Sequence, residues 1–165
     1  MSKHYSSFDA GVEWDTPDYV WEPIADAVGG FDLGPASGAE GEQQKADTLY
    51  TKEDDGLAQE WFGDVWINPP YGRQFNSEWG QKVWNEHKSC NTDSITALVP
   101  ASTSTNWWQN NYANADLFCF IDHRLKFNDE NMSASFANVI CYFGEPNDEI
   151  VDVFDELGFV AESVL

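Results

Sequence analysis

Residues 65–73 read VWINPPYGR, and this stretch decides how the rest of the chain is interpreted. Its three apolar residues, Val65 to Ile67, predict a short buried strand. The strand runs into an asparagine and two prolines, and a proline lacks a backbone N–H and keeps the residue before it out of helical angles. We therefore expect a stiff, extended loop that presents two hydrogen-bond acceptors, the side-chain oxygen of Asn68 and the carbonyl of Pro69, beside the flat ring of Tyr71.

A loop of this kind suits chemistry at a planar amino group. Such a group is a poor nucleophile when its lone pair is delocalised into a ring or a carbonyl. Two acceptors that hold its two hydrogens would favour a pyramidal nitrogen and stabilise the positive charge that develops as the nitrogen attacks. The alternative is a proline-rich turn without a catalytic role, because a four-residue match can arise by chance.

Strand-like and helix-like segments alternate on both sides of this turn. Strands are predicted at 31–34, 65–67, 94–101, 116–122 and 135–144, and helices at 16–28, 76–90, 104–115 and 147–159. Thr16 can cap the first helix and Pro17 can occupy its first position, and residues 35–47 are expected to form a loop. The alternation predicts an α/β fold whose functional residues lie at the carboxyl ends of the strands.

The composition is that of one globular domain. The chain has 165 residues, of which 42% are hydrophobic and 15% aromatic. We expect residues 1–12 to be a lead-in and residues 13–165 to form the domain. No apolar run approaches the ~18 residues of a membrane span and the start lacks the apolar core of a signal peptide, so we expect a cytoplasmic protein. Three cysteines without zinc-ligand spacing predict no metal site.

The charge is strongly negative. Acidic residues number 29 against 8 Lys plus Arg, which gives a net charge of −21. A nucleic-acid-binding protein normally carries the opposite sign. One explanation is a halophilic protein, because at ~1 M salt the Debye length is only ~3 Å and surface charges barely interact. The other is that the protein does not bind nucleic acid or mimics it, and composition alone leaves both open.

Several motifs carry a resemblance to a known family. Asn-Pro-Pro-Tyr resembles the catalytic signature of amino-group methyltransferases that use S-adenosylmethionine, and the whole set is similar to the phage-type DNA N-6-adenine methyltransferase (Dam) family. The motifs are Glu13 to Pro17, Phe31 to Leu33, Glu53 to Leu57, Asn68 to Gly72, Leu98 to Ala101, Trp107 to Trp108, and Arg124 to Phe127. The resemblance covers roughly residues 13–143. It implies a minimal, single Rossmann-like methyltransferase domain without a separate target-recognition domain, in a host-cell cytoplasm if the protein is viral.

The resemblance also implies roles for individual residues in an adenine N6-methyltransferase that acts on a flipped-out base in DNA. The implied catalytic residues are Asn68, Pro69, Pro70 and Tyr71, with the Tyr71 ring stacked on the base. The implied cofactor-binding residues are Trp14, Thr16, Pro17, Asp32, Pro35, Ser37, Asp54 and Asp55. The candidates for phosphate contacts are Arg73, Arg124 and Lys126, which use scarce positive charge near the turn.

The chain departs from the family at two places. Gly34 stands where members often have an acid, and the stretch between Gly38 and Asp54 is too short for a full helix and second strand. The acid that would bind the cofactor ribose is therefore not identified, although Glu40 and Asp47 are candidates. Two other functions remain open: methylation of a glutamine side-chain amide in a protein, and a non-catalytic acidic protein that mimics DNA or binds partners.

Overall fold

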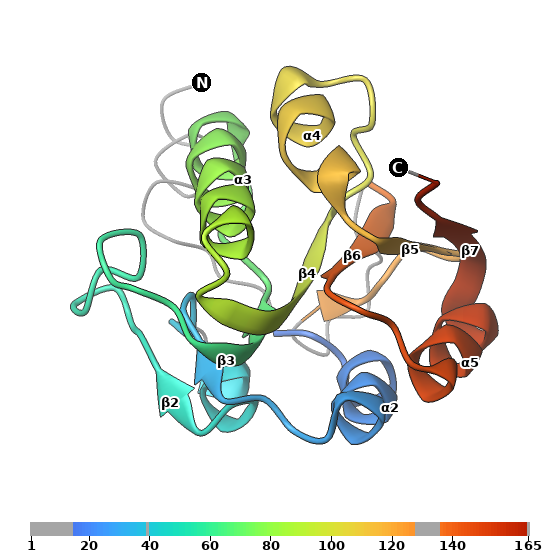
Figure 1. The fold of residues 1–165 in the computed structure, drawn as a ribbon, viewed down its shortest axis with the longest axis horizontal. Helices are drawn as coiled ribbons and strands as arrows, with labels where there is room; N and C mark the ends of the chain where they lie inside the picture. The colour runs from blue at the N-terminus through green and yellow to red at the C-terminus, as the bar shows by residue number, and fades with distance from the viewer. Residues whose placement is uncertain (1–14, 39, 128–135, 165) are drawn as a thin grey trace.

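The structure, a computed structural model, describes residues 15–38, 40–127 and 136–164. A seven-stranded sheet lies between two layers of helices (Figure 1). The strands, in spatial order, are β2 (Thr48–Leu49), β1 (Leu33–Gly34), β3 (Gly63–Ile67), β4 (Thr92–Pro100), β6 (Asn138–Phe143), β5 (Leu117–Ile121) and β7 (Gly158–Glu162). The first four are parallel, β6 runs antiparallel between β4 and β5, and β7 pairs antiparallel with β5. The expected α/β architecture is thus confirmed.

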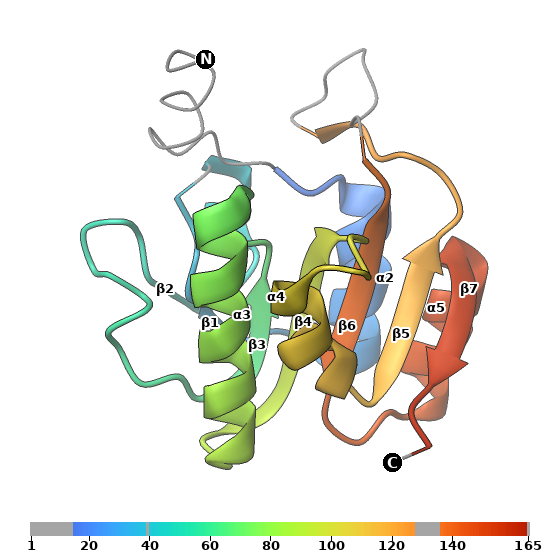
Figure 2. The same cartoon turned by 90° about the horizontal axis from the view of Figure 1, so that it is seen from above.

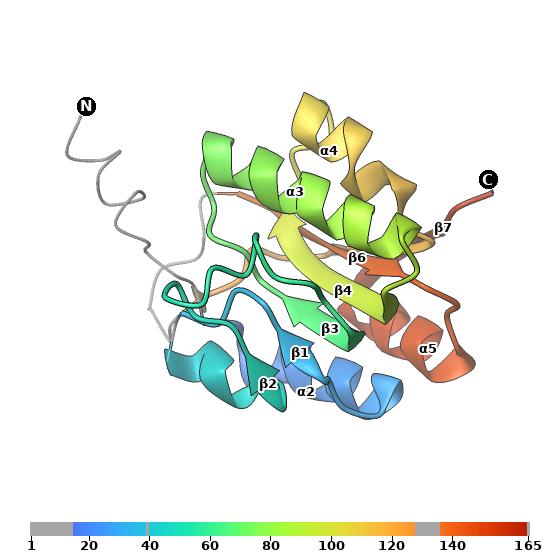
Figure 3. The ribbon, with the colours of Figure 1, turned by 60° about the vertical axis from the view of Figure 1, so that its left-hand side comes forward.

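The helices divide between the two faces of the sheet, as Figure 3 shows from the side. The helices α2 (Asp18–Val28) and α5 (Asp148–Leu157) pack on one face, and α3 (Arg73–Lys88), α4 (Asn106–Asn110) and the short 3-10 helix η2 (Tyr112–Asn114) pack on the other. Each face has its own apolar cluster. Because the central strands are covered on both sides, β4 and β6 read as continuous buried runs rather than alternating ones.

Three elements were not predicted from the sequence. The 3-10 helix η1 (Glu40–Gln44) lies within the segment expected to be a loop, and the two-residue strand β2 follows it. The stretch judged too short for a helix and a strand therefore holds a reduced version of both. The strand β7 follows α5 without an intervening loop, and its residues are partly buried or exposed, with none fully buried.

The helix starts also differ from the sequence-based expectation. Helix α3 begins at Arg73 rather than 76, and α2 begins at Asp18. Pro17 is the residue before the first helical position of α2, and the N-terminus has no side-chain cap. The expected cap was wrong because the Thr16 side chain is used elsewhere, in contacts with Glu42 and Asn68.

The order of the strands creates a topological switch point between β1 and β3, where the connections between strands run in opposite directions. The chain leaves β1 toward β2 on one side and leaves β3 toward β4 on the other. In sheets of this type, ligands bind outside the carboxyl ends of the strands where the connections diverge. In Figure 2 this edge of the sheet is at the top, where β5 also ends. The Asn-Pro-Pro-Tyr turn follows β3 and so lies at this edge.

Candidate active site at the carboxyl ends of the strands

Asn68 directly follows β3 at the switch point, and a hydrogen bond to the segment before α2 holds its side chain there. The residue is 5% exposed, and its Nδ2 donates to Thr16 Oγ1 over 3.0 Å. Thr16 lies in the segment that enters α2 and is itself buried. The structure therefore brings together the Thr-Pro segment and the Asn-Pro-Pro-Tyr turn, which are separated by about fifty residues in the sequence.

A buried carboxylate, Glu42 in η1, organises this contact. It accepts from the Thr16 N–H at 3.3 Å, the Thr16 hydroxyl at 3.1 Å and Trp66 Nε1 at 3.2 Å, and its Oε2 pairs with Lys45 Nζ at 3.1 Å. Glu42 and Lys45 are 3% and 5% exposed. A charged group this deeply buried needs an opposite charge and several hydrogen bonds, and here it has both. Glu42 was not predicted from the sequence. Its spacing of three residues from Lys45 could have indicated the ion pair.

A cavity of about 150 Å³ opens beside the turn. Among its lining residues are Pro35 and Ser37 from the loop after β1, Asp55 from the acidic segment, and Pro70 from the turn. The side chains of Leu57, Phe75 and Trp79 make its apolar wall, and Ala36, Gly38, Thr51, Lys52, Gly56 and Glu78 complete it. Four residues that were predicted to belong to the site, from three separate segments, thus border one cavity.

The two acids of the segment 51–57 have different positions. Asp54 Oδ2 accepts from the N–H of Thr51 at 2.9 Å and from its hydroxyl at 3.1 Å, so Asp54 shapes its own turn. Asp55 lines the cavity and adopts φ 55°, a left-handed conformation that aspartate tolerates better than most residues. Next to it, a side chain on Gly56 would collide with the Pro35 carbonyl, so the acidic segment and the β1 loop approach each other closely.

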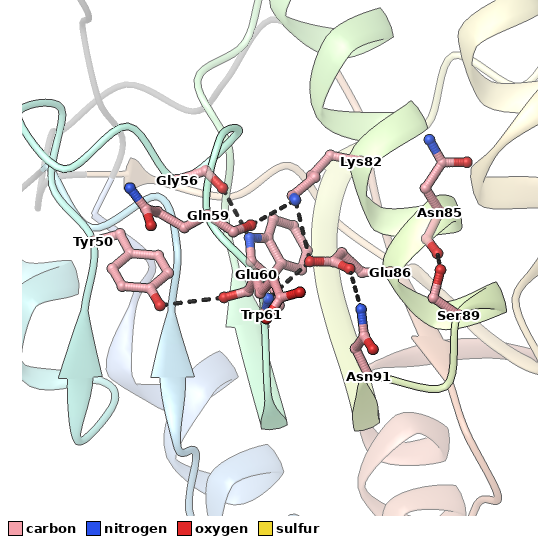
Figure 4. A network of polar contacts seen from close by, with 10 residues as sticks. All are labelled: Tyr50, Gly56, Gln59, Glu60, Trp61, Lys82, Asn85, Glu86, Ser89 and Asn91. Atoms are coloured by element: carbon pink, nitrogen blue, oxygen red, sulfur yellow. Dashed lines mark hydrogen bonds and ion pairs between the residues drawn. The ribbon is translucent and has the colours of Figure 1, made fainter.

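A network of polar contacts fixes this segment to α3, as Figure 4 shows. Trp61 Nε1 donates to the Gly56 carbonyl at 2.9 Å, and the Trp61 N–H donates to Glu86 Oε1 at 2.8 Å. Glu86 also pairs with Lys82 at 3.1 Å and accepts from Asn91 at 2.8 Å. Burial alone would raise the pKa of Glu86, but the hydrogen bonds from Asn91, Trp61 and Lys82 outweigh burial and lower it.

Tyr71 is a buried anchor in this structure. Its ring is 2% exposed and lies edge-on to Phe127 and Phe136, with centroids 6.1 and 5.4 Å away. Its hydroxyl donates to the Leu98 carbonyl at 3.1 Å and accepts from Asn138 Nδ2 at 3.2 Å. Burial holds the pKa of this phenol well above its usual value. Stacking of Tyr71 on a base therefore stays a prediction.

Four of the residues predicted to bind the cofactor, among them Asp54, do not border the cavity in the described part of the chain. Thr16 makes the internal contacts described above, and Pro17 sits at the start of α2. Asp32 lies at the amino end of β1, where its Oδ2 accepts from the Asp64 N–H at 2.8 Å. This end of the sheet is opposite to the turn. Trp14 lies outside the described residues.

Of the two candidates for the ribose-binding acid, Asp47 does not border the cavity. Asp47 precedes β2 and so lies near the amino ends of the parallel strands. The side chain of Glu40 lies outside the described residues.

The predicted phosphate contacts lie at the same edge of the sheet as the turn. Arg73 begins α3, and Arg124 and Lys126 follow β5, with Leu125 and Phe127 buried between and beyond them. All three basic side chains are exposed, and within residues 15–38, 40–127 and 136–164 none has a carboxylate within 4.0 Å. Lys52 adds a further positive charge at the cavity. Lys52, Arg73, Arg124 and Lys126 therefore lie at this edge of the sheet, whereas Lys88 lies in the last turn of α3, over the Trp84 ring.

A comparison with protein-family models gives a direct assignment. The model for DNA N-6-adenine-methyltransferase (Dam) matches residues 7–144, which is most of the chain. The chain belongs to the Dam family. Membership supports DNA adenine methyltransferase activity in general, with DNA as substrate. The turn, the cavity and the basic residues described above all lie within the part that matches the Dam model.

One further comparison and one property of the helices are negative findings. No curated protein matches the chain. Within the residues that the structure describes, no helix of this Dam-family chain is long and apolar enough to cross a membrane.

Proposed function

We propose that the protein transfers a methyl group from S-adenosylmethionine to the exocyclic amino nitrogen of adenine in DNA. The observation that carries this proposal is the convergence at the switch point. Pro70 of the Asn-Pro-Pro-Tyr turn lines the same cavity as Pro35, Ser37 and Asp55, although these residues come from three different segments. In a Rossmann-like domain, this is the place where a cofactor and a reacting group would meet.

The residues around the cavity fit the cofactor chemically. The apolar wall of Leu57, Phe75 and Trp79 suits a flat ring, and the carboxylates of Asp55 and Glu78 suit a cation. A volume of about 150 Å³ is below the roughly 300–1,000 Å³ typical of sites that enclose a whole ligand. The cavity would thus enclose one part of the cofactor, held by Pro35, Ser37 and Asp55. When bound, S-adenosylmethionine supplies an electrophilic methyl group on a positively charged sulfur.

The turn supplies the groups that act on the adenine. The Asn68 side-chain oxygen and the Pro69 carbonyl accept the two amino hydrogens and so fix the direction of the nitrogen lone pair. The same acceptors stabilise the positive charge that develops on this nitrogen during transfer. Since the amino group of a paired adenine is not accessible, the base has to leave the double helix. Tyr71 would then contact the ring of the extrahelical base.

The basic residues at this edge would hold the DNA backbone. Arg73, Arg124 and Lys126 are exposed and lie beside the turn, so they can reach phosphates on either side of an extrahelical nucleotide. We propose that residues 13–165 form this methyltransferase domain, and that the short loops at the edge read the DNA sequence.

The test of this function identifies the methylated product. The purified protein is incubated with methyl-labelled S-adenosylmethionine and either adenine-containing DNA or a protein mixture, and the DNA is digested to nucleosides. We expect the label to co-migrate with N6-methyldeoxyadenosine. Label on glutamine in protein would favour the protein methyltransferase alternative. Absence of cofactor binding would favour the acidic mimic.

A further inference from the structure

The hydrogen bonds between Glu42, Thr16 and Asn68 have a defined direction. A carboxylate accepts hydrogen bonds and does not donate them, so the contact of 3.1 Å between Thr16 Oγ1 and Glu42 Oε1 uses the only hydroxyl hydrogen of Thr16. The Thr16 oxygen can therefore only accept from Asn68. This matches the bond of 3.0 Å from Asn68 Nδ2.

The direction of the hydrogen bond from Thr16 to Glu42 also determines which end of the Asn68 amide can face Thr16. An asparagine amide has a donor end and an acceptor end, which differ little in shape but are opposite in function. With Nδ2 bound to Thr16, the acceptor end of Asn68 is Oδ1. If the amide were rotated by half a turn, two acceptor oxygens would face each other at Thr16, and an NH2 group would face the substrate.

Glu42 is itself held firmly in place. Donors from three residues reach its two oxygens: the N–H and the hydroxyl of Thr16, Trp66 Nε1, and the ammonium group of Lys45. Trp66 belongs to β3, the strand that leads into the turn. The carboxylate thus connects the entry of α2, the end of β3 and η1 around the catalytic asparagine.

We propose that Glu42 and Thr16 are positioning residues that fix the orientation of the Asn68 amide, so that its oxygen is the end that accepts the adenine amino hydrogen. This inference rests on the proposed function of the site. It also gives Thr16 a different role from the cofactor contact implied by the family resemblance, because the only hydroxyl hydrogen of Thr16 and one acceptor lone pair are used inside the protein.

The test compares Thr16→Val with Thr16→Ser. Valine removes the hydroxyl with almost no change of shape, whereas serine keeps it. Both variants leave the pair of Glu42 and Lys45 in place, so the fold should survive. For Thr16→Val we expect kcat to fall roughly tenfold to a hundredfold, as for other small losses of alignment in active sites, with the cofactor Kd within about twofold of wild type. Thr16→Ser should keep most of the activity.

A second variant tests the carboxylate. Glu42→Gln keeps the size of the side chain but replaces one acceptor with a donor, so it should lower kcat in the same way as Thr16→Val. Glu156→Gln is the matched control, because it removes one charge from an exposed position on α5. If Glu42→Gln does not fold, the comparison of the two Thr16 variants still decides.

A spectroscopic measurement makes the test independent of catalysis. The side-chain amide signals of Asn68 are assigned in the nitrogen-proton NMR spectrum of the protein by their loss in Asn68→Ala. We expect these signals to shift or broaden in Thr16→Val and to remain near their wild-type positions in Thr16→Ser. Signals unchanged in Thr16→Val would overturn the proposal, even if the wild-type protein proved to methylate no DNA and the proposed function failed.

Kinetics provides the other contradictory result. Thr16→Val with unchanged kcat and a weaker cofactor Kd would show that Thr16 binds the cofactor and does not position Asn68. Equal loss of kcat in Thr16→Val and Thr16→Ser would also overturn the proposal, because serine retains the hydroxyl on which the orientation depends.

Discussion

At the residue scale, neighbouring side chains of the site have separate tasks. Asp54 accepts two hydrogen bonds from Thr51 and shapes the loop, whereas Asp55 lines the cavity in a left-handed conformation. Asn68 is oriented by buried contacts, and Tyr71, three residues later, anchors the end of the turn to β4 and β6. Each substitution at this scale should therefore change one measurable property.

Asp55→Asn should weaken cofactor binding without unfolding the protein. Asparagine also tolerates a left-handed conformation, so the loop should keep its shape and the stability should change by less than about 0.5 kcal/mol. Loss of one charge near a cationic ligand should raise the cofactor Kd roughly fivefold to tenfold, since a pair of charges 4 Å apart in water interacts by about 1 kcal/mol. Isothermal titration calorimetry measures this change.

The matched control for Asp55→Asn is Glu53→Gln, an exposed acid of the same segment that does not line the cavity. An equal loss of affinity in both variants would mean that the net charge of the segment matters and not the position of Asp55.

Tyr71→Phe should lower stability more than its small chemical change suggests. It removes a hydroxyl that is bonded to the Leu98 carbonyl and to Asn138, and it leaves these buried groups without that partner. We expect the free energy of unfolding to fall by about 1–3 kcal/mol, against about 3–5 kcal/mol for Tyr71→Ala. Urea denaturation provides the comparison. A Tyr71→Phe protein as stable as wild type would show that these hydrogen bonds do not hold the turn.

At the element scale, helix α3 and the segment before β3 form one unit. Lys82 and Glu86 of α3 bind Gln59 and Trp61, and Trp61 in turn binds Gly56 at the cavity wall. The indole of Trp61 also stacks on Trp79 of α3, with centroids 6.4 Å apart. The cavity wall therefore depends on a network centred on a helix residue that does not itself line the cavity.

Glu86 gives this network a pH dependence. Its pKa is lower in the folded protein than its usual value of 4.5, so its contribution to stability is full above that pH and is lost as the pH falls through the lowered pKa. We expect Glu86→Gln to be less stable than wild type at pH 7, with the difference in unfolding free energy shrinking below about pH 4.5. Urea denaturation across a pH series measures it.

Glu156→Gln, at an exposed position on α5, is the control for Glu86→Gln because it shows the effect of net charge alone. A difference between Glu86→Gln and wild type that stayed constant down to pH 3 would contradict the assignment.

The elements also show what the sequence could and could not predict. The strands β3, β4, β5 and β6 were predicted because their buried runs are continuous, and α5 because its apolar residues recur at helical spacing. The elements η1 and β2 are too short to produce a periodic pattern, and β7 has no turn residues that separate it from α5.

The same limit applies to the site. The residues Pro35, Ser37, Asp55 and Pro70 were chosen from motifs and do border one cavity. Glu42 was missed because its role depends on burial among Thr16, Trp66 and Lys45, and its spacing of three residues from Lys45 indicates an ion pair but not burial. Asp32 was chosen because its segment resembles the first strand of the family, but its side chain is used at the amino ends of the strands.

At the scale of the whole molecule, the charge is distributed very unevenly. The net charge is −21, and α5 exposes five acids on the side facing solvent: Asp148, Glu149, Asp152, Asp155 and Glu156. The salt bridges between described residues use the acids Glu42, Glu86, Asp116 and Asp122. The acids of α5 thus contrast with the site, near which the basic residues Lys52, Arg73, Arg124 and Lys126 lie.

This distribution predicts that salt should increase both folding and activity. Screening reduces the repulsion among the acids, as the Debye length falls from ~30 Å at 0.01 M to ~3 Å at 1 M. Salt also weakens phosphate contacts, but only a few basic residues can make them, whereas the repulsion involves the whole surface. Circular dichroism and methyl transfer, measured together across a KCl series, test this balance. Full folding and maximal activity in dilute buffer, with steady loss on adding salt, would contradict the halophilic explanation.

The central claim is that Asn68, at the end of β3, is the acceptor on which methyl transfer depends. The most direct measurement compares wild type, Asn68→Ala and Asn85→Ala for the rate of N6-methyladenine formation and for cofactor Kd. Asn85 is the matched control, because its side chain is exposed on α3. We predict that Asn68→Ala lowers the rate by about a hundredfold or more, with cofactor Kd close to wild type and no effect of Asn85→Ala. Asn68→Ala methylating adenine at the wild-type rate would contradict the account.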